Sequence, residues 1–405
     1  MMELLLLWMI YFSWVYWVLA CWGVRTFFKP GRRSERGTPS TYTPPVSILK
    51  PVCGLDHGAF ENFASFCRQD YPEFEIIFGV ASRSDPAVRI IRDLQRTFPE
   101  RRIKLVVGRP VGANQKVGLL YYMEREARHD VLVLSDSDMR VGPDYLRRVV
   151  APLAEPDVGL VTCPYRGEDA ISLPAKLEAL HMSVIFLPSV VIAWKLGLSF
   201  ALGATVVIRR RDLMRIGGFR AIADYLADDF QLGCRIGSLG LKTMLSNYVT
   251  VSVLGRTTFT DQWNREVRWA KCNRVSRPRE YPGILLTLPT PLAGAFAVVS
   301  GFSPQSQQVL LISLVLRLVA AWLITGCVGD RNGRKYLFLL PIREMLSALV
   351  WFAGLVGRRI VWRGREYILA EHGKMVACSC ASCADASEEV EPSVAGTDRR
   401  GRIAN

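Results

Sequence analysis

Hydrophobic residues form long runs near both ends of the chain and short, regularly spaced runs between them. The first long run, Leu4 to Val24, holds no charged residue and carries six Trp and Tyr side chains, which is typical of a membrane helix with interfacial aromatics. A cleaved signal peptide is the alternative. The stretch has no basic region before it, is long, and is followed by the basic residues of 25–36. We therefore expect a retained anchor over residues 1–28, with the residues that follow it in the cytoplasm.

Short β-type runs alternate with helical patterns over residues 46–280. The runs are Val46 to Val52, Glu75 to Ser82, Ile103 to Gly108, Val131 to Leu134, Val158 to Cys163 and Gly203 to Arg210. This alternation predicts βαβ units, a largely parallel sheet and an α/β domain. A linker rich in Gly, Pro, Ser and Thr, residues 29–45, separates the domain from the anchor. Inside the domain, Ile171 to Phe200 is unusually apolar and fits either core or a surface lying at the bilayer.

Three more hydrophobic segments follow at residues 281–358, namely Gly283 to Phe302, Val309 to Val328 and Tyr336 to Gly357. One basic cluster precedes the first segment, another follows the second segment, and a third follows the third segment. If every segment crosses the membrane, these clusters cannot all lie on the cytoplasmic side. We expect one segment to be re-entrant or interfacial. The candidate is Tyr336 to Gly357, because it contains Arg343 and Glu344. Residues 359–405 are predicted to form a basic, disordered cytoplasmic tail.

The net charge of +14 in 405 residues raises the question of a nucleic-acid partner. Lys and Arg cluster beside the apolar segments, where they would meet anionic lipid headgroups, and no pattern of an RNA-binding module is present. We therefore expect a membrane and no nucleic acid. The ten cysteines have no disulfide-scaffold spacing and are expected to be free thiols. Cys378, Cys380 and Cys383 lack a fourth zinc ligand, which favours an unstructured tail over a zinc site.

Candidate chemistry begins where the run Val131 to Leu134 ends at Asp136 and Asp138. Ligands bind outside the carboxyl ends of strands in open α/β sheets. Two carboxylates two residues apart can share a hard divalent cation that also holds phosphates. The alternative is a turn in which these side chains only hydrogen-bond their own backbone.

Four further charged residues stand at the ends of predicted elements. Asp85 follows the second run and precedes a helix, so it is either a site residue or a helix cap. Lys116 ends a Gly-containing loop and offers a cation for a diphosphate. Asp228 and Asp229 open a helical pattern, either as capping acids or with one of them as a general base.

A last polar cluster has helical spacing. Arg265 and Arg268 lie at i and i+3, with Trp269 beside them, so they are able to face phosphates together. A solvated basic face is the alternative.

Taken in order, these clusters resemble lipid glycosyltransferases of the family 2 type, and most closely the ceramide glucosyltransferase family. The resemblance covers residues 46–367 and rests on the SDP of Asp85, the DSD of Asp136, the DDF of Asp229 and the REVRW of Arg265 to Trp269. VSILKPVCGLD, the NQK ending at Lys116 and WRGREY at 362–367 also fit. Phe186 to Val191 reads FLPSVV where animal ceramide enzymes carry a histidine, so acceptor contacts do not carry over.

The resemblance implies a GT-A fold and an inverting transfer from a UDP-sugar to a lipid hydroxyl. Asp229 would be the general base, Asp136 and Asp138 would hold Mn²⁺ or Mg²⁺, and the donor would contact Asp85, Lys116, Asp136, Arg265, Arg268 and Trp269. The expected protein is integral and multi-pass, in a bacterial inner membrane, with a cytoplasmic catalytic domain.

Four readings of the function follow. The first is transfer of glucose to ceramide, and the second is transfer of N-acetylglucosamine to bacteriohopanetetrol, as in similar bacterial proteins. A processive polysaccharide synthase ranks below these, because only about four segments are long enough to span. A membrane-anchored nucleotide-sugar-binding protein without activity is disfavoured by the intact carboxylates.

Overall fold

The alternation of strands and helices expected from the sequence is present in a computed structural model, which describes residues 1–29 and 42–378. The α-helices are α1 Met2–Phe28, α2 Ala59–Cys67, α3 Ala87–Thr97, α4 Gln115–Glu126, α5 Tyr145–Val150, α6 Leu173–His181, α7 Leu187–Lys195, α8 Arg210–Arg215, α9 Asp228–Ser238, α10 Phe259–Ser276, α11 Pro289–Val299, α12 Pro304–Cys327, α13 Arg331–Lys335 and α14 Leu340–Leu355. The strands are β1 Val46–Pro51, β2 Phe74–Val80, β3 Arg102–Val107, β4 Val131–Leu134, β5 Met139–Arg140, β6 Val158–Thr162, β7 Tyr165–Ala170, β8 Val206–Arg209, β9 Lys242–Leu245, β10 Thr250–Gly255, β11 Arg359–Trp362, β12 Arg365–Leu369 and β13 Met375–Ala377. Most of the predicted linker, together with Cys380 and Cys383, lies outside the described residues.

A seven-stranded sheet in the order β3-β2-β1-β4-β8-β6-β9 forms the centre of the domain. β1, β2 and β4 are buried along their whole length, which explains their continuous apolar runs. The sheet is mixed rather than wholly parallel, because β8 runs antiparallel to both of its neighbours. Val206 pairs with Leu134, so the chain enters β8 at the carboxyl edge of β4. The loop before β8 therefore lies at the same edge as Asp136 and Asp138, which form a D-x-D motif.

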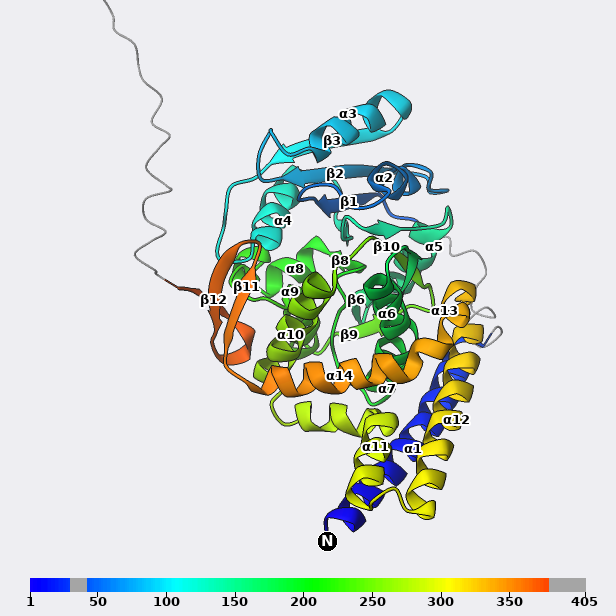
Figure 1. Ribbon diagram of the computed structural model, residues 1–405. Helices are drawn as coiled ribbons and strands as arrows, with labels where there is room; N and C mark the ends of the chain where they lie inside the picture. The colour runs from blue at the N-terminus through cyan, green and yellow to red at the C-terminus, as the bar shows by residue number, and fades with distance from the viewer. Residues whose placement is uncertain (30–41, 379–405) are drawn as a thin grey trace, which may run out of the picture.

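The helices expected to meet the membrane gather below this domain (Figure 1), where α1, α11 and α12 lie side by side and α14 runs across its base. Within residues 1–29 and 42–378, four helical stretches are long and apolar enough to span a bilayer, namely Met2–Phe28, Leu173–Lys195, Pro304–Cys327 and Leu337–Leu355. The first of the three late segments is instead bent by 78° between Tyr281–Thr287 and Pro289–Val299. α14, in the segment expected to be re-entrant or interfacial, is one continuous helix across the base of the domain, and its place relative to a membrane stays a prediction.

The apolar stretch after Ile171 is mostly core. Over Leu173–Lys195, 67% of the most apolar window is buried, and α7 packs against α1. Leu187 and Val191 of α7 join Trp17 of α1 and Ala320 of α12 in one apolar cluster. This helix therefore connects α1 and α12 to the central sheet, whose β9 contributes Leu245 to the same cluster.

The charged residues within the late segments neutralise one another. Two ion pairs do this, Arg317 of α12 with Glu344 of α14 and Arg343 of α14 with Glu266 of α10. All four side chains are buried. Arg343 makes a bidentate pair with Glu266 of α10, at 2.7 and 2.6 Å. Since an unpaired charge in an apolar setting is costly, each pair makes its helices depend on one another.

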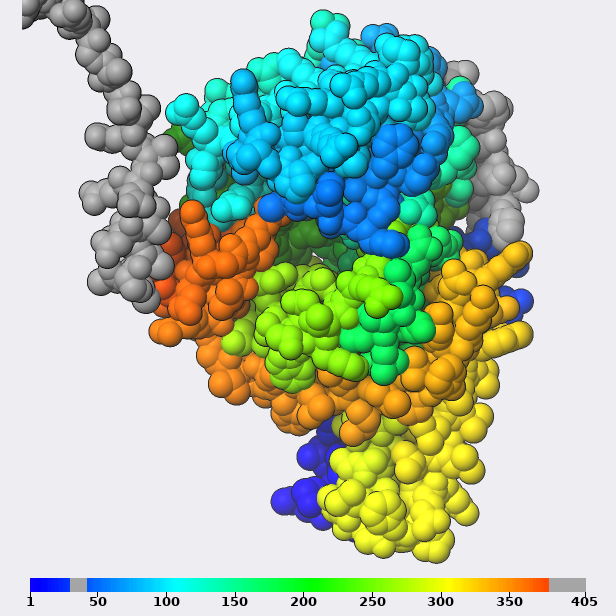
Figure 2. Space-filling model, turned by 45° about the horizontal axis from the view of Figure 1, so that its top comes forward, coloured from blue at the N-terminus to red at the C-terminus, as the bar shows by residue number. Residues whose placement is uncertain are grey.

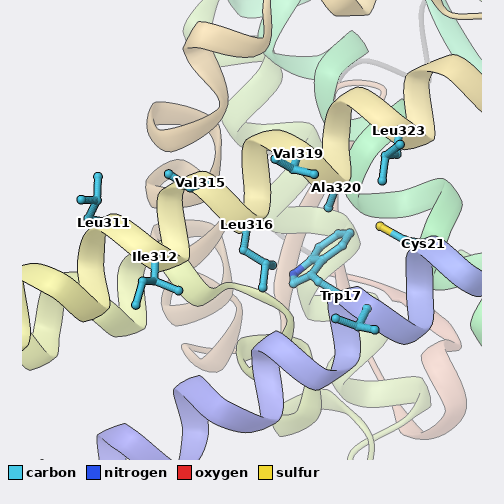
Figure 3. Close-up of a pocket in the computed structure, with 10 residues that line it drawn as sticks. Trp17, Cys21, Leu311, Ile312, Val315, Leu316, Val319, Ala320 and Leu323 are labelled. Carbon is cyan, nitrogen blue, oxygen red and sulfur yellow. The ribbon is translucent and has the colours of Figure 1, made fainter.

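An apolar groove of about 660 Å³ separates α1 from α12 (Figure 3). Trp17 and Cys21 approach it from α1, facing Leu316 and Ala320 of α12. No polar side chain lines it, which suits a surface in contact with lipid chains.

The tail departs from the expected disorder. Residues 359–377 form an antiparallel sheet of β11, β12 and β13, which packs through Tyr367 and Leu369 against Cys272 of α10. The prediction of a disordered tail is therefore wrong over these residues, because alternating apolar side chains of the strands find a partner surface on α10. Residues 379–405 lie outside the described part of the chain.

Candidate active site

The loop carrying the D-x-D is fixed from beneath by a buried lysine. Lys50 of β1 is fully buried, and its Nζ donates a hydrogen bond to the main-chain oxygen of Asp136 at 2.7 Å. The same ammonium lies 3.8 Å from the ring centre of Phe66. Burial lowers the pKa of Lys50 to about 7, although Asp138 and Asp136 act in the opposite direction. The lysine orients the peptide from which the Asp136 side chain projects.

The second D-x-D carboxylate, Asp138, is half-buried and is tied to a neighbouring strand. Oδ2 of Asp138 accepts a hydrogen bond from Ser252 of β10 at 2.6 Å, while Ser137 donates to Asp56 in the loop after β1. Burial, reinforced by Asp136, raises the pKa of Asp138 to about 7. The turn is thus tied to two other elements, rather than only to its own backbone.

Lys116 brings the third element to this edge. Its Nζ lies 2.6 Å from Oδ1 of Asp136 and 3.5 Å from Oδ2 of Asp228. Burial acts to lower the pKa of Lys116, but Asp136, Asp228 and Asp229 together raise it above its ordinary value. Asn114 sets this geometry, because its side chain caps α4 by accepting from the Val117 amide. Lys116 is therefore a charged group at the first turn of α4.

Asp229 faces the same point from α9. Its Oδ2 accepts a hydrogen bond from the Gly203 amide at 2.8 Å, and its Oδ1 accepts one from Phe230 at 2.7 Å. Burial, reinforced by Asp228, raises the pKa of Asp229 to about 6. A carboxylate of this pKa is ionised at neutral pH and still accepts a proton readily.

Gly203 marks the centre of the arrangement. A Cβ at this residue would lie 3.0 Å from Oδ2 of Asp136, 3.1 Å from Nζ of Lys116 and 3.4 Å from Oδ2 of Asp229. Three charged groups from β4, α4 and α9 thus surround a space that only a glycine leaves free. We call this space the Gly203 cradle.

The two arginines of α10 do not act as the matched pair expected from their spacing. Arg265 pairs with the buried Glu178 of α6. Arg268 makes no ion pair with a described residue, and burial, with added repulsion from Arg265 and Arg363, lowers its pKa to about 10. Trp269 is 39% exposed. Of these two arginines, Arg268 is therefore the one that remains available to an anion.

Asp85 has the contacts of a cap. Its Oδ1 accepts from the Ala87 amide at 2.9 Å and its Oδ2 from the Gly54 amide at 3.0 Å. The carboxylate therefore joins the start of α3 to the loop after β1, which lies beside the D-x-D through Asp56. That Asp85 contacts the donor stays a prediction.

A hollow opens over these residues. Figure 2 shows it between the N-terminal half of the domain, α10 and the β11–β12 hairpin. Among the described residues, no three His, Cys, Asp or Glu side chains converge as a complete metal site. The free oxygen of Asp136 at the cradle and the nearby Asp138 suit a hard cation whose remaining ligands come from a diphosphate.

Sequence reasoning missed several residues of this edge, namely Lys50, Asp56, Gly203 and Ser252. Lys50 carried a signal, since a lysine inside a fully apolar strand pattern requires a buried partner. Gly203 carried none, because its role depends on three side chains from distant elements.

The chain resembles known proteins both in structure and in sequence. The structure resembles the mannosyltransferase PcManGT from Pyrobaculum calidifontis, solved in complex with GDP-Man and Mn²⁺, with a TM-score of 0.51 and 18% identity over 87% of this chain and 99% of that one. This confirms the expected GT-A fold. Ceramide glucosyltransferase 1 of Caenorhabditis elegans is 23% identical over 368 residues, 86% of this chain and 77% of the relative. Ceramide glucosyltransferase 3 of the same organism is 23% identical over 83% of this chain and 75% of the relative. Residues 5–375 match the model of glycosyl transferase family 21. The chain therefore belongs to that family of glycosyltransferases.

Proposed function

We propose that this glycosyltransferase moves glucose from UDP-glucose to the primary hydroxyl of ceramide at a membrane surface, with inversion at the anomeric carbon. The observation that carries the proposal is the Gly203 cradle, where the half-buried carboxylate of Asp229, a lysine and a D-x-D aspartate surround one space. The names of the Caenorhabditis relatives favour ceramide over a hopanoid acceptor.

The apolar surroundings of the cradle support a lipid acceptor. Leu202 precedes Gly203 and Phe230 follows Asp229, and both belong to the apolar cluster that contains Trp17 of α1 and Ala320 of α12. The catalytic edge is therefore continuous with the membrane helices. A lipid whose chains remain in the bilayer would need to raise only its hydroxyl to reach Asp229.

In the proposed reaction Asp229 accepts the proton of the attacking hydroxyl, because its pKa is raised and its orientation is fixed by two main-chain amides. Lys116 and Arg268 neutralise charge on the departing diphosphate. Asp136 and Asp138 would hold Mn²⁺ or Mg²⁺, which, when bound, stabilises negative charge on the leaving group. Asp85 would contact the uridine, and Arg265 would act through Glu178 to position α10.

The proposal is tested with the purified full-length protein in lipid vesicles. UDP-glucose and UDP-N-acetylglucosamine are each supplied with ceramide, with bacteriohopanetetrol or with no acceptor, and products are identified by mass spectrometry. We expect glucosylceramide and a stoichiometric release of UDP. Product from the hopanoid alone would assign the other acceptor, and a polymer formed without added lipid would contradict lipid transfer.

A further inference from the structure

The β11–β12 hairpin ends in a turn whose sequence is unusual for its geometry. Trp362 pairs with Arg365, so the turn consists of Arg363 and Gly364 alone. Their φ angles are +50° and +76°. Both residues are therefore left-handed, as in a type I′ turn, where Asn-Gly is the favoured pair. An arginine at the first position is strained there, which directs attention to what its charge does.

The three-stranded sheet that contains the hairpin is joined to both loops that deliver site residues, through β13, the turn before β13, and Tyr367 of β12. The Met375 amide donates to the oxygen of Asp224 at 2.7 Å, and the Leu226 amide donates to the oxygen of Gly373 at 3.1 Å. These contacts hold the loop that leads into Asp228 and Asp229. The side chain of Tyr367 reaches the oxygen of Ala113 at 3.5 Å, next to the loop that leads into Lys116. The position of the hairpin is thus fixed relative to the cradle.

The hairpin also borders the open hollow. In Figure 2 its orange surface borders the hollow at the left, beside the N-terminal half of the domain. Arg363 is exposed at its tip and lies over Trp362, 5.5 Å from the ring centre. The tip is therefore open to a molecule that enters the hollow.

α10 packs against the hairpin, since Cys272 shares an apolar cluster with Ile360 and Tyr367, and each of these elements carries a guanidinium group without a carboxylate partner among the described residues. Within the described part of the chain, neither Arg268 nor Arg363 forms an ion pair, whereas Arg265 is neutralised by Glu178. Arg363 is close enough for its charge to contribute to the lowered pKa of Arg268. Neighbouring like charges with no counter-ion favour the binding of an anion with several oxygens.

We propose that Arg363 is a further donor-binding residue, which with Arg268 holds the phosphate oxygens of the nucleotide diphosphate. This inference rests on the proposed function, since the donor supplies the anion. It assigns to the C-terminal hairpin a part in binding the donor. It also explains why an arginine occupies a turn position that favours asparagine.

The test replaces the charge with the residue that the turn prefers. Arg363→Asn removes the guanidinium and relieves backbone strain, so the unfolding midpoint of the full-length protein in detergent should stay the same or rise. The affinity for UDP, measured by calorimetry with Mn²⁺ present, should fall about tenfold. The affinity for uridine, which has no phosphate, should not change. Arg363→Lys should recover part of the UDP affinity, because it restores charge without the planar fork.

Arg359→Gln is the matched control, since it removes an exposed arginine of the same hairpin away from the tip. Wild-type affinity for UDP in Arg363→Asn would overturn the inference and leave the proposed function intact. An equal loss of UDP affinity in Arg359→Gln, or an equal loss of affinity for uridine, would also overturn it. A wild-type protein that binds neither UDP nor UDP-glucose would overturn the proposed function itself.

Discussion

The amide of Gly203 donates a hydrogen bond to Oδ2 of Asp229, at 2.8 Å. This contact joins the loop before β8 to the first turn of α9. The contact leaves the carboxylate facing Asp136 and Lys116 across the space at Gly203. One main-chain group thus orients the proposed base and borders the space in which the reaction would occur. The first three predictions concern this contact.

Asp229→Asn should abolish turnover while donor binding persists. The amide cannot accept the hydroxyl proton, and loss of a general base costs about 10² to 10⁴ in rate. Because the amide also loses one acceptor for its two main-chain donors, we expect stability to fall by about 1 kcal/mol. Glucosylceramide formation and UDP binding are measured in the same preparation. Asp130→Asn, at a highly exposed site, is the control, and turnover within tenfold of wild type in Asp229→Asn would remove Asp229 from this role.

The pH profile should report the same carboxylate. The pKa of Asp229 is raised to about 6, by burial first and by Asp228 second, and only the ionised form accepts a proton. Activity should therefore increase as the pH rises through about 6 and fall by up to tenfold per unit below it. The measurement is kcat/KM for UDP-glucose between pH 5 and pH 8 at saturating ceramide. A kcat/KM that stays constant down to pH 5, as expected for a carboxyl of ordinary pKa near 4, would show that burial does not tune this group.

Gly203→Ala should separate folding from catalysis. The backbone of Gly203 is not in the left-handed region, so alanine fits the chain, but its Cβ would approach the ends of Asp136, Lys116 and Asp229 at 3.0 to 3.4 Å. These flexible ends can move, so the unfolding midpoint should change little, whereas the space for the reacting groups is lost. We expect activity to fall by at least about tenfold. Gly294→Ala, with nothing within 4 Å of its Cβ, should leave activity unchanged, and equal activities in the two variants would contradict the importance of the cradle.

The elements that the sequence predicted well are those whose pattern is local. β1, β2 and β4 follow apolar runs to within about two residues, because strands buried on both faces are apolar throughout. β7 was missed because YRGEDA is polar, and it pairs with β10 85 residues later along the chain. β11 and β12 were missed because a basic composition resembles a tail. Their partner surface on α10 is formed only after folding.

The candidate site likewise contains residues that a local pattern predicts and contacts that no local pattern predicts. Asp136, Lys116 and Asp229 were predicted because each follows a strand or opens a helix, and the structure brings them together at the carboxyl edge of the sheet. The pairing of Arg265 with Glu178 was not predicted, since the two residues are 87 positions apart and helical spacing reports only the face of one helix. Roles that depend on such distant contacts are not visible in a local pattern.

The buried pair of Arg343 and Glu266 provides the last prediction, which concerns stability. Arg343→Met would leave the Glu266 carboxylate buried without its partner, which costs about 3–5 kcal/mol, whereas Glu266→Met together with Arg343→Met removes both charges and should recover most of that loss. Unfolding by denaturant, followed by Trp fluorescence in one detergent, measures both variants. Lys242→Met, which breaks an exposed pair with Asp157, should cost less than about 1 kcal/mol. If Arg343→Met and Lys242→Met destabilise equally, the pair does not hold α14 to α10, because a buried charge left alone must cost more than an exposed one.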